Sequence, residues 1–134
     1  MDAYPLLQQA TLLIVEDDAL VREALIAMFD EVGSRVVSAS DAEEGVTQAQ
    51  QHRPDIVICD IGLPGMDGYY FVQCLREHEL SYGLKPALAV ALTGAVSDIA
   101  QMRSVAEGFD HFVAKPVNPA ALFDLLCAAL RKRA

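Results

Sequence analysis

The chain has 134 residues, of which 53% are hydrophobic and 22% are charged, and this is the size and composition of one globular domain. The composition excludes an intrinsically disordered chain, and no apolar run approaches the ~18 residues that indicate a membrane span. Ten basic and nineteen acidic residues give a formal net charge of −9. Because like charges repel, we expect no direct nucleic-acid binding and no membrane insertion.

The start of the chain and its cysteines indicate a reducing compartment. Residues 1–5 lack the basic start of a secretory signal. The cysteines Cys59, Cys74 and Cys127 are odd in number, lie in apolar surroundings and show no CxxC spacing. We therefore expect three buried, reduced thiols and a cytoplasmic location.

Short apolar runs alternate with helix-like segments along the chain. The runs are typical of strands buried on both faces of a parallel sheet. The predicted strands are 11–15, 35–39, 55–59, 87–92 and 111–114. The predicted helices lie between Asp18 and Gly33, Ser40 and His52, Asp67 and Ser81, Ser97 and Gly108, and from Asn118 to the basic C-terminal end. This alternation predicts an α/β domain over residues 11–134, with a short lead-in at 1–10 and helices on both faces of a parallel sheet.

The predicted helix starts carry side chains suited to capping. Asp18, Asp67 and Asn118 each precede a helical pattern, and Ser40 to Glu43 has the spacing of a capping box. In the first helix, apolar residues recur at helical spacing from Leu20 onward.

Polar side chains follow four of the predicted strands. Glu16-Asp17-Asp18 follow the first strand, Asp60 the third, Thr93 the fourth and Lys115 the fifth. Ligands of an open α/β sheet bind beyond the carboxyl ends of its strands, so these groups are expected to converge. Crowded carboxylates repel unless a cation lies between them, and a few hard oxygen ligands suit Mg²⁺.

This set of groups predicts phosphoryl chemistry. A carboxylate beside a metal ion can act as a nucleophile and form an aspartyl-phosphate. Asp60 is the best nucleophile candidate because it stands alone at its strand end, whereas Glu16 and Asp17 have the charge density of a metal platform. Lys115 and the Thr93 hydroxyl would neutralise charge on the phosphoryl oxygens. Taken singly, Asp18 would be a helix cap, Thr93 a turn residue and Lys115 a surface lysine.

These motifs resemble the receiver domain of two-component response regulators, the CheY-like superfamily. The resemblance covers residues 11–130 and is carried by LLIVEDD at 12–18, DIVICDIGLPGMDG at 55–68, ALTG at 91–94 and KP at 115–116. It implies a doubly wound, five-stranded parallel sheet in the order 2-1-3-4-5. The segments DIGLPGMDGY and GFDHFVAKPV are most similar to receivers of hybrid sensor kinases.

The resemblance also implies a metal site and a phosphoacceptor. Asp60 would be the phosphoacceptor, Asp17 a direct Mg²⁺ ligand, Glu16 a ligand acting largely through water, and the Gly62 carbonyl a backbone ligand. Relatives often carry larger polar side chains at the positions of Gly62 and Ala95, which tune the loss of the phosphoryl group.

The remaining implied roles concern switching. Thr93 would move to bond the phosphoryl group, and Lys115 would pair with it, aimed inward by a cis Lys115-Pro116 bond. Phe112 matches an aromatic switch position, although a plain core aromatic would suit the same place.

We therefore expect a signalling phosphoacceptor rather than an enzyme in the ordinary sense, with only Mg²⁺-dependent autophosphorylation and slow hydrolysis. A histidine kinase or a histidine phosphotransfer protein would donate the phosphoryl group to Asp60. The output would reach a downstream protein through the last two helices and the last strand. A second copy of the chain is a further expected partner, which would give a homodimer.

Three alternatives differ from this expectation in testable ways. An aspartate-nucleophile phosphatase needs a second aspartate two residues on, where this chain has Gly62. A flavin-binding protein needs a phosphate loop after the first strand, where Glu16-Asp17-Asp18 would repel phosphate. A pseudo-receiver that serves only as a docking module is the remaining alternative.

Overall fold

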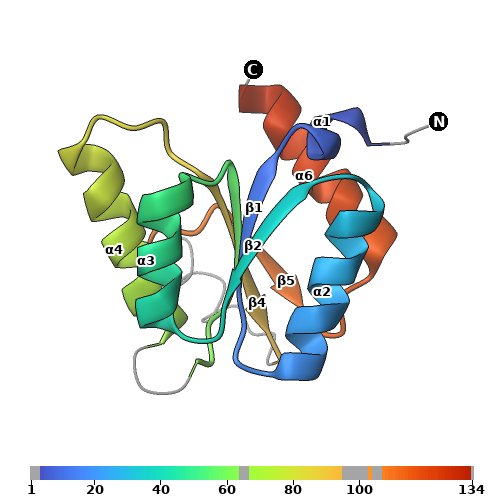
Figure 1. The fold of residues 1–134 in the computed structure, drawn as a ribbon, viewed down its shortest axis with the longest axis horizontal. Helices are drawn as coiled ribbons and strands as arrows, with labels where there is room; N and C mark the ends of the chain where they lie inside the picture. The colour runs from blue at the N-terminus through green and yellow to red at the C-terminus, as the bar shows by residue number, and fades with distance from the viewer. Residues whose placement is uncertain (1–3, 64–66, 95–102, 104–106, 134) are drawn as a thin grey trace.

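The structure is a computed structural model, and it describes residues 4–63, 67–94, 103 and 107–133. Its centre is a parallel sheet in the order β2-β1-β3-β4-β5, which confirms the expected winding (Figure 1). The strands are β1 (Thr11–Val15), β2 (Arg35–Ala39), β3 (Ile56–Asp60), β4 (Leu88–Thr93) and β5 (His111–Ala114).

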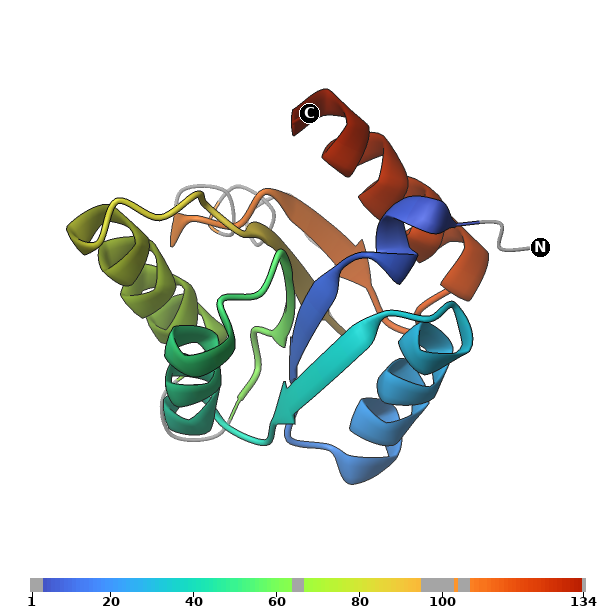
Figure 2. The same ribbon diagram turned by 45° about the horizontal axis from the view of Figure 1, so that its top comes forward.

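Helices cover both faces of the sheet (Figures 1 and 2). The described helices are α1 (Pro5–Gln8), α2 (Ala19–Glu31), α3 (Ala42–His52), α4 (Gly68–Ser81) and α6 (Pro119–Arg133). Helices α3 and α4 pack on one face, and α2 and α6 on the other, with α1 beside α6. Most of the helix expected between Ser97 and Gly108 lies outside the described residues. In the part of the chain that the structure describes, no helix is both long and apolar enough to span a membrane.

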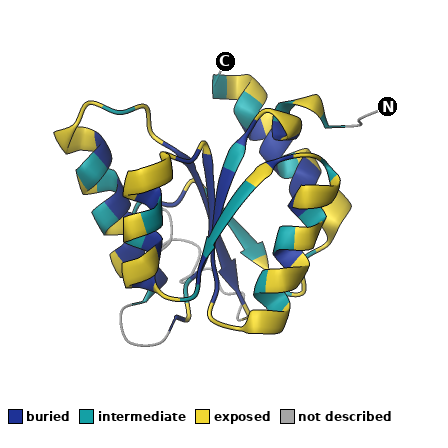
Figure 3. Ribbon diagram, in the orientation of Figure 1, coloured by how far each residue is buried: buried dark blue, intermediate teal, exposed yellow. Residues whose placement is uncertain are grey.

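The central strands supply two apolar cores, one on each side of the sheet. In β1, Leu12 and Ile14 pack toward α2 and α6, whereas Leu13 and Val15 pack toward α3 and α4. Every residue of β3 and β4 is buried (Figure 3). Burial on both faces explains why these strands are unbroken apolar runs rather than alternating ones.

Three predicted helix caps are confirmed. The side chains of Asp18, Asp67 and Asn118 each accept a hydrogen bond from a backbone N–H in the first turn of α2, α4 and α6. These bonds satisfy donors that a helix start leaves without partners. Two of these caps lie next to the carboxyl edge of the sheet and fix how the chain leaves β1 and how it enters α4.

The capping-box prediction at Ser40 is wrong by one residue. Asp41 is the cap, and its carboxylate accepts from the Glu44 N–H at 2.8 Å. Ser40 instead donates from its hydroxyl to the Glu44 side chain. Ser40 and Asp41 are both good N-cap residues, and each has a glutamate three residues later, Glu43 or Glu44. The capping-box spacing therefore fits either residue and does not decide between them.

Two strand boundaries also differ from the prediction by one residue, and both affect the site. Asp60 is the last residue of β3 and Thr93 the last residue of β4, whereas both were expected just beyond their strands. Asp55 precedes β3, and its carboxylate accepts from the Thr11 N–H at 2.9 Å. Asp60 and Thr93 are therefore held by the hydrogen-bond ladder of the sheet rather than by a loop.

The lead-in is part of the packed domain. Leu7 in α1 is fully buried in the core beside α6, and the Ser34 hydroxyl donates to the Leu7 carbonyl at 2.6 Å. The Tyr4 ring lies 4.9 Å from that of Phe123. A single helical turn is too short to produce a detectable apolar period, which is why the sequence did not show this packing.

Two side chains are more exposed than expected. Leu20 is 79% exposed because the first turn of α2 lies beyond the end of β1. Cys59 and Cys127 are buried and form no disulfide, as predicted, but Cys74 is only half-buried. It flanks the buried stripe of α4, which runs through Phe71 and Leu75.

Candidate functional site

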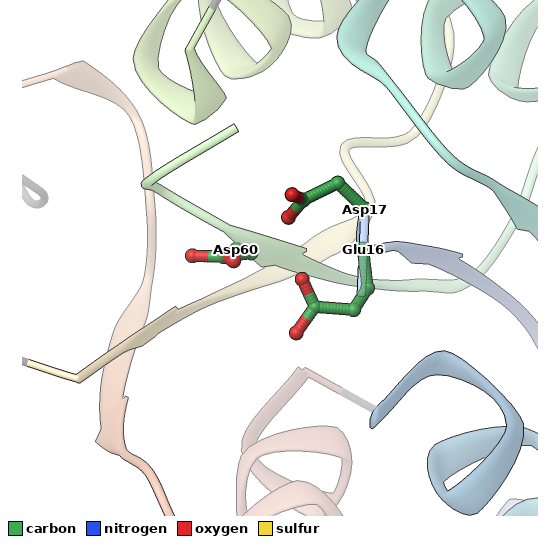
Figure 4. A group of neighbouring side chains, drawn as sticks. All are labelled: Glu16, Asp17 and Asp60. Atoms are coloured by element: carbon green, nitrogen blue, oxygen red, sulfur yellow. The ribbon is translucent and has the colours of Figure 1, made fainter. Parts of the chain in front are cut away.

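Three carboxylates converge at the carboxyl edge of the sheet. Glu16 and Asp17 follow β1 directly, and Asp60 ends the neighbouring strand β3. One oxygen from each of the three side chains lies within 4.8 Å of the others. Figure 4 shows the three groups turned toward a common space. Glu16 and Asp60 are buried and Asp17 is exposed, so the cluster opens to solvent on the Asp17 side.

Lys115 is the cation of this cluster. Its Nζ donates to Glu16 Oε1 at 2.6 Å and to Asp60 Oδ2 at 3.0 Å. Lys115 directly follows β5, and its backbone N–H donates to the Thr93 carbonyl at 2.8 Å. The Lys115-Pro116 peptide bond is cis. A residue at the edge of the sheet thus reaches across β4 to neutralise charge between β1 and β3.

Backbone groups around Asp60 complete its surroundings. The Gly62 N–H donates to Asp60 Oδ1 at 2.8 Å. At Gly68, the first residue of α4, an added Cβ would lie 2.6 Å from the Asp60 carbonyl oxygen. No larger residue fits at that position without displacing the backbone. The close approach packs α4 directly against the end of β3.

The two buried carboxyls differ in pKa. Burial, and then the neighbouring Asp60 carboxylate, raise the pKa of Glu16 to about 7, and Lys115 offsets only part of this. Burial also acts to raise the pKa of Asp60, but Glu16, the Gly62 N–H and Lys115 outweigh it, so the pKa of Asp60 is lowered. Without a metal ion, Asp60 therefore holds its negative charge while Glu16 readily takes up a proton.

The same contacts keep Lys115 charged. Burial acts to lower the pKa of Lys115, but its bonds to Glu16 and Asp60 outweigh this effect and the pKa is raised. Burial and the adjacent carboxylates raise the pKa of the Cys59 thiol well above its ordinary value. Cys59, next to Asp60 in β3, is therefore a core thiol and not a nucleophile.

The carboxylate cluster fits a divalent cation. Within the described residues, Glu16 Oε2 is a buried oxygen with no hydrogen-bond partner. A buried acceptor without a donor is costly, and a metal ion or its water would satisfy it. Three carboxylate oxygens with solvent on one side suit a hard cation that keeps several waters, as Mg²⁺ does.

Two other predicted site residues, Thr93 and Phe112, lie in the neighbouring strands β4 and β5. Thr93, at the end of β4, is buried, and its neighbour Leu92 is in register with Asp60. Phe112 in β5 is half-buried, pairs with Ala91 and packs against the core on the side of α3 and α4. Ala95 lies outside the described residues.

The structure adds Arg22, which sequence reasoning missed. Arg22 Nη1 donates to the Glu16 carbonyl at 2.9 Å and to the Asp17 carbonyl at 3.4 Å. These bonds fix the turn that presents both acids. An arginine in the first turns of a helix carries no sequence signal for such a contact, because a solvent-exposed position has the same pattern.

Comparison with known proteins agrees with this geometry. Residues 12–127 match the family described as the response regulator receiver domain. The chain is 35% identical over 121 residues to the two-component response regulator PhoP of Pseudomonas aeruginosa, covering 90% of this chain and 52% of that protein. The chain therefore belongs to the receiver domain family of two-component response regulators, whose members are signalling phosphoacceptors.

Solved structures support the same fold. A CheY-like receiver domain from Methanospirillum hungatei has a TM-score of 0.78 at 28% identity, covering 91% of this chain and 94% of that one. CheY4 of Vibrio cholerae has a TM-score of 0.79 at 28% identity, with 88% and 96% covered. The receiver domain of Saccharomyces cerevisiae Ssk1 shares the fold, with a TM-score of 0.81 at 24% identity and 85% and 83% covered.

Several curated relatives extend beyond this domain. The chain spans about half the length of PhoP and of the Streptomyces coelicolor transcriptional regulatory protein AfsQ1, to which it is 31% identical over 91% of its length. The shared part is the receiver domain alone.

Proposed function

We propose that Asp60 is the phosphoacceptor of this receiver domain and takes a phosphoryl group from the phosphohistidine of a histidine kinase or a histidine phosphotransfer protein. The observation that carries the proposal is the position of Asp60 between Lys115 Nζ, 3.0 Å from Oδ2, and the Gly62 N–H, 2.8 Å from Oδ1. These donors lower the pKa of Asp60 and keep it ionised. An ionised carboxylate that retains donors on both oxygens is oriented for attack.

The chemistry follows from these contacts. An oxygen of Asp60 attacks phosphorus, the bond from phosphorus to the donor imidazole nitrogen breaks, and that nitrogen keeps the electron pair and takes up a proton. The product is an acyl phosphate on Asp60. Lys115 is placed to exchange part of its contact with Asp60 for a phosphoryl oxygen, and the Thr93 hydroxyl would bond another.

Glu16, Asp17 and Asp60 would hold Mg²⁺, together with the Gly62 carbonyl. The ion, when bound, supplies positive charge to the phosphoryl oxygens. The chain offers this ion two buried carboxylates and one exposed carboxylate as oxygen ligands. One of the buried oxygens, Glu16 Oε2, has no hydrogen-bond partner among the described residues. Water then hydrolyses the acyl phosphate slowly, so the domain is an enzyme only in this limited sense.

The output is proposed to reach a downstream protein. Thr93 ends β4, one residue beyond the register partner of Asp60, and Phe112 lies in the edge strand β5, where it is only half-buried. Movement of these side chains after phosphorylation would change the surface around β5, through which the output is proposed to pass. The fold relative Ssk1 was crystallised with the histidine phosphotransfer protein Ypd1, and a donor of that class is proposed for this chain.

Intact-mass spectrometry after incubation with acetyl phosphate tests the proposal. One phosphoryl group should be added in the presence of Mg²⁺ and none in EDTA. The Asp60→Asn variant should gain nothing, and the control Asp30→Asn, at the exposed end of α2, should match the wild type. No labelling of the wild type under any of these conditions would favour the docking-module alternative.

A further inference from the structure

A second pocket lies at the end of the molecule opposite Asp60. It has a volume of about 490 Å³, within the roughly 300–1,000 Å³ typical of small-molecule sites. Its lining includes Ala10, Asp55 and Ala87, which precede β1, β3 and β4, whereas the carboxylate cluster follows these strands. Figure 1 shows that α1, the end of α6 and the connection from α4 to β4 meet at this end. The full length of the sheet therefore separates the pocket from the phosphoacceptor site.

The floor of this pocket is apolar. It is contributed by α1, α3, α4, α6 and the residue before β4, through Leu6, Ala49, Leu75, Ala87 and Leu130. Ala49 and Ala87 are small side chains that leave room between the longer ones. A floor made by five segments and lined in part by buried residues favours a compact apolar group over a hydrated ion.

The rim carries unusual positive charge for a chain of net charge −9. Arg53, Lys85 and Arg133 line the pocket, together with His78. Arg133 donates to the Pro86 carbonyl. Arg53 and Lys85 are exposed and form no ion pair with any other described residue. Arg53 also has a left-handed backbone, with φ at 45°, where glycine or asparagine would avoid strain.

The acidic residues of the pocket are already engaged. Both Glu79 oxygens accept hydrogen bonds, one from Arg76 and one from the Ala87 N–H. Asp55 accepts from the Thr11 N–H. The carbonyl ends of α3, α4 and α6 point toward this end of the molecule and disfavour anions. Attraction for an anion must therefore come from the side chains of Arg53, Lys85 and Arg133.

We propose that this pocket binds a small amphipathic anion, namely an apolar body of ring size that carries one carboxylate, sulfonate or phosphate group. The apolar body would lie on the floor, and the acidic group would lie between Arg53 and Lys85. Because the site is at the far end of the sheet, its failure would leave the phosphoacceptor proposal untouched, and the reverse also holds.

An NMR titration of amide resonances with naphthalene sulfonate tests this site. We expect saturable shifts at the amides of Arg53, Asp55, Leu84, Lys85 and Ala87, and about tenfold weaker binding of the neutral naphthalene methanol. The double variant Arg53→Gln, Lys85→Gln should weaken sulfonate binding at least about tenfold, with its spectrum otherwise unchanged. The control Arg35→Gln, an exposed cation at the same end but outside the pocket, should bind as the wild type does.

Three outcomes would overturn the proposal. One is the absence of saturable shifts at millimolar probe, and another is a set of shifts centred elsewhere. The third is sulfonate binding by the double variant that equals binding by the wild type, because Arg53 and Lys85 would then contribute nothing to the site. If the double variant unfolds, the single variant Lys85→Gln gives the same test, since Lys85 lies beyond the end of α4.

Discussion

The pH dependence of stability in the metal-free protein depends on Glu16. Its pKa is raised from 4.5 to about 7 in the folded state. Each pH unit of such a difference corresponds to about 1.4 kcal/mol. Ionising Glu16 therefore costs the folded protein about 3 kcal/mol more than it costs the unfolded chain. The folded state binds more protons between pH 4.5 and 7, so stability falls as the pH rises through this window.

The other two groups of the cluster act outside that window. The pKa of Asp60 is lowered, so its contribution is lost only as the pH falls below its ordinary value of 3.8. The pKa of Lys115 is raised, so its contribution is lost only as the pH rises above 10.5. The interval from pH 5 to pH 8 therefore isolates Glu16 within the cluster.

Urea denaturation in EDTA, followed by circular dichroism from pH 5 to pH 8, measures this effect in the wild type and in Glu16→Gln. Glutamine resembles the neutral carboxyl, so the variant should lack the loss. Relative to the wild type, it should gain about 2.5 kcal/mol between the two pH values, because part of the loss already falls below pH 5, whatever its offset at pH 5. Subtracting the two stability curves removes every contribution that the two proteins share, and the exposed Glu43→Gln variant serves as the control. Parallel curves, or a wild type that gains on the variant as the pH rises, would refute the reasoning.

Three further predictions concern the same edge of the sheet. Mg²⁺ at about 100 times its Kd should stabilise the wild type by about 2.7 kcal/mol, seen as a higher Tm, and Asp17→Asn should reduce this shift; an unchanged Tm would contradict the metal site. Lys115→Ala should leave Mg²⁺ binding intact but lose about 2 kcal/mol in EDTA at pH 8 by urea denaturation, because it leaves buried carboxylates without a cation. It should also uncouple phosphorylation from partner binding, and partner affinity that still responds to phosphorylation would contradict this. Gly68→Ala should lose about 2–3 kcal/mol, because its Cβ would meet the Asp60 carbonyl at 2.6 Å. Gly94→Ala, where the added Cβ meets no atom within 4 Å, should lose less, and equal losses would contradict the argument from close packing.

The sheet and the convergence of the site were predictable because they depend on patterns with a clear physical origin. Uninterrupted apolar runs specify strands buried on both faces, and the carboxyl ends of parallel strands meet at one edge. Those two rules bring Glu16, Asp17, Asp60 and Lys115 together without any knowledge of distances. The predicted caps at Asp18, Asp67 and Asn118 succeeded because short polar side chains satisfy the free N–H groups of a helix start.

Other features depend on contacts that leave no pattern along the chain. Asp41 rather than Ser40 caps α3, although the two residues are adjacent and both are good N-cap residues. The bond from Arg22 to the Glu16 carbonyl and the close packing of Gly68 on Asp60 depend on tertiary geometry. The burial of Leu7 comes from one helical turn that docks beside α6.

The central claim is that Asp60, rather than Glu16 or Asp17, carries the phosphoryl group. Borohydride reduces an acyl phosphate to an alcohol and so marks the modified residue permanently. After incubation with acetyl phosphate and Mg²⁺, reduction and peptide mass spectrometry should find the converted side chain at residue 60 alone. A converted side chain at residue 16 or 17, or an unmodified residue 60 in a protein that has gained a phosphoryl group, would contradict the account.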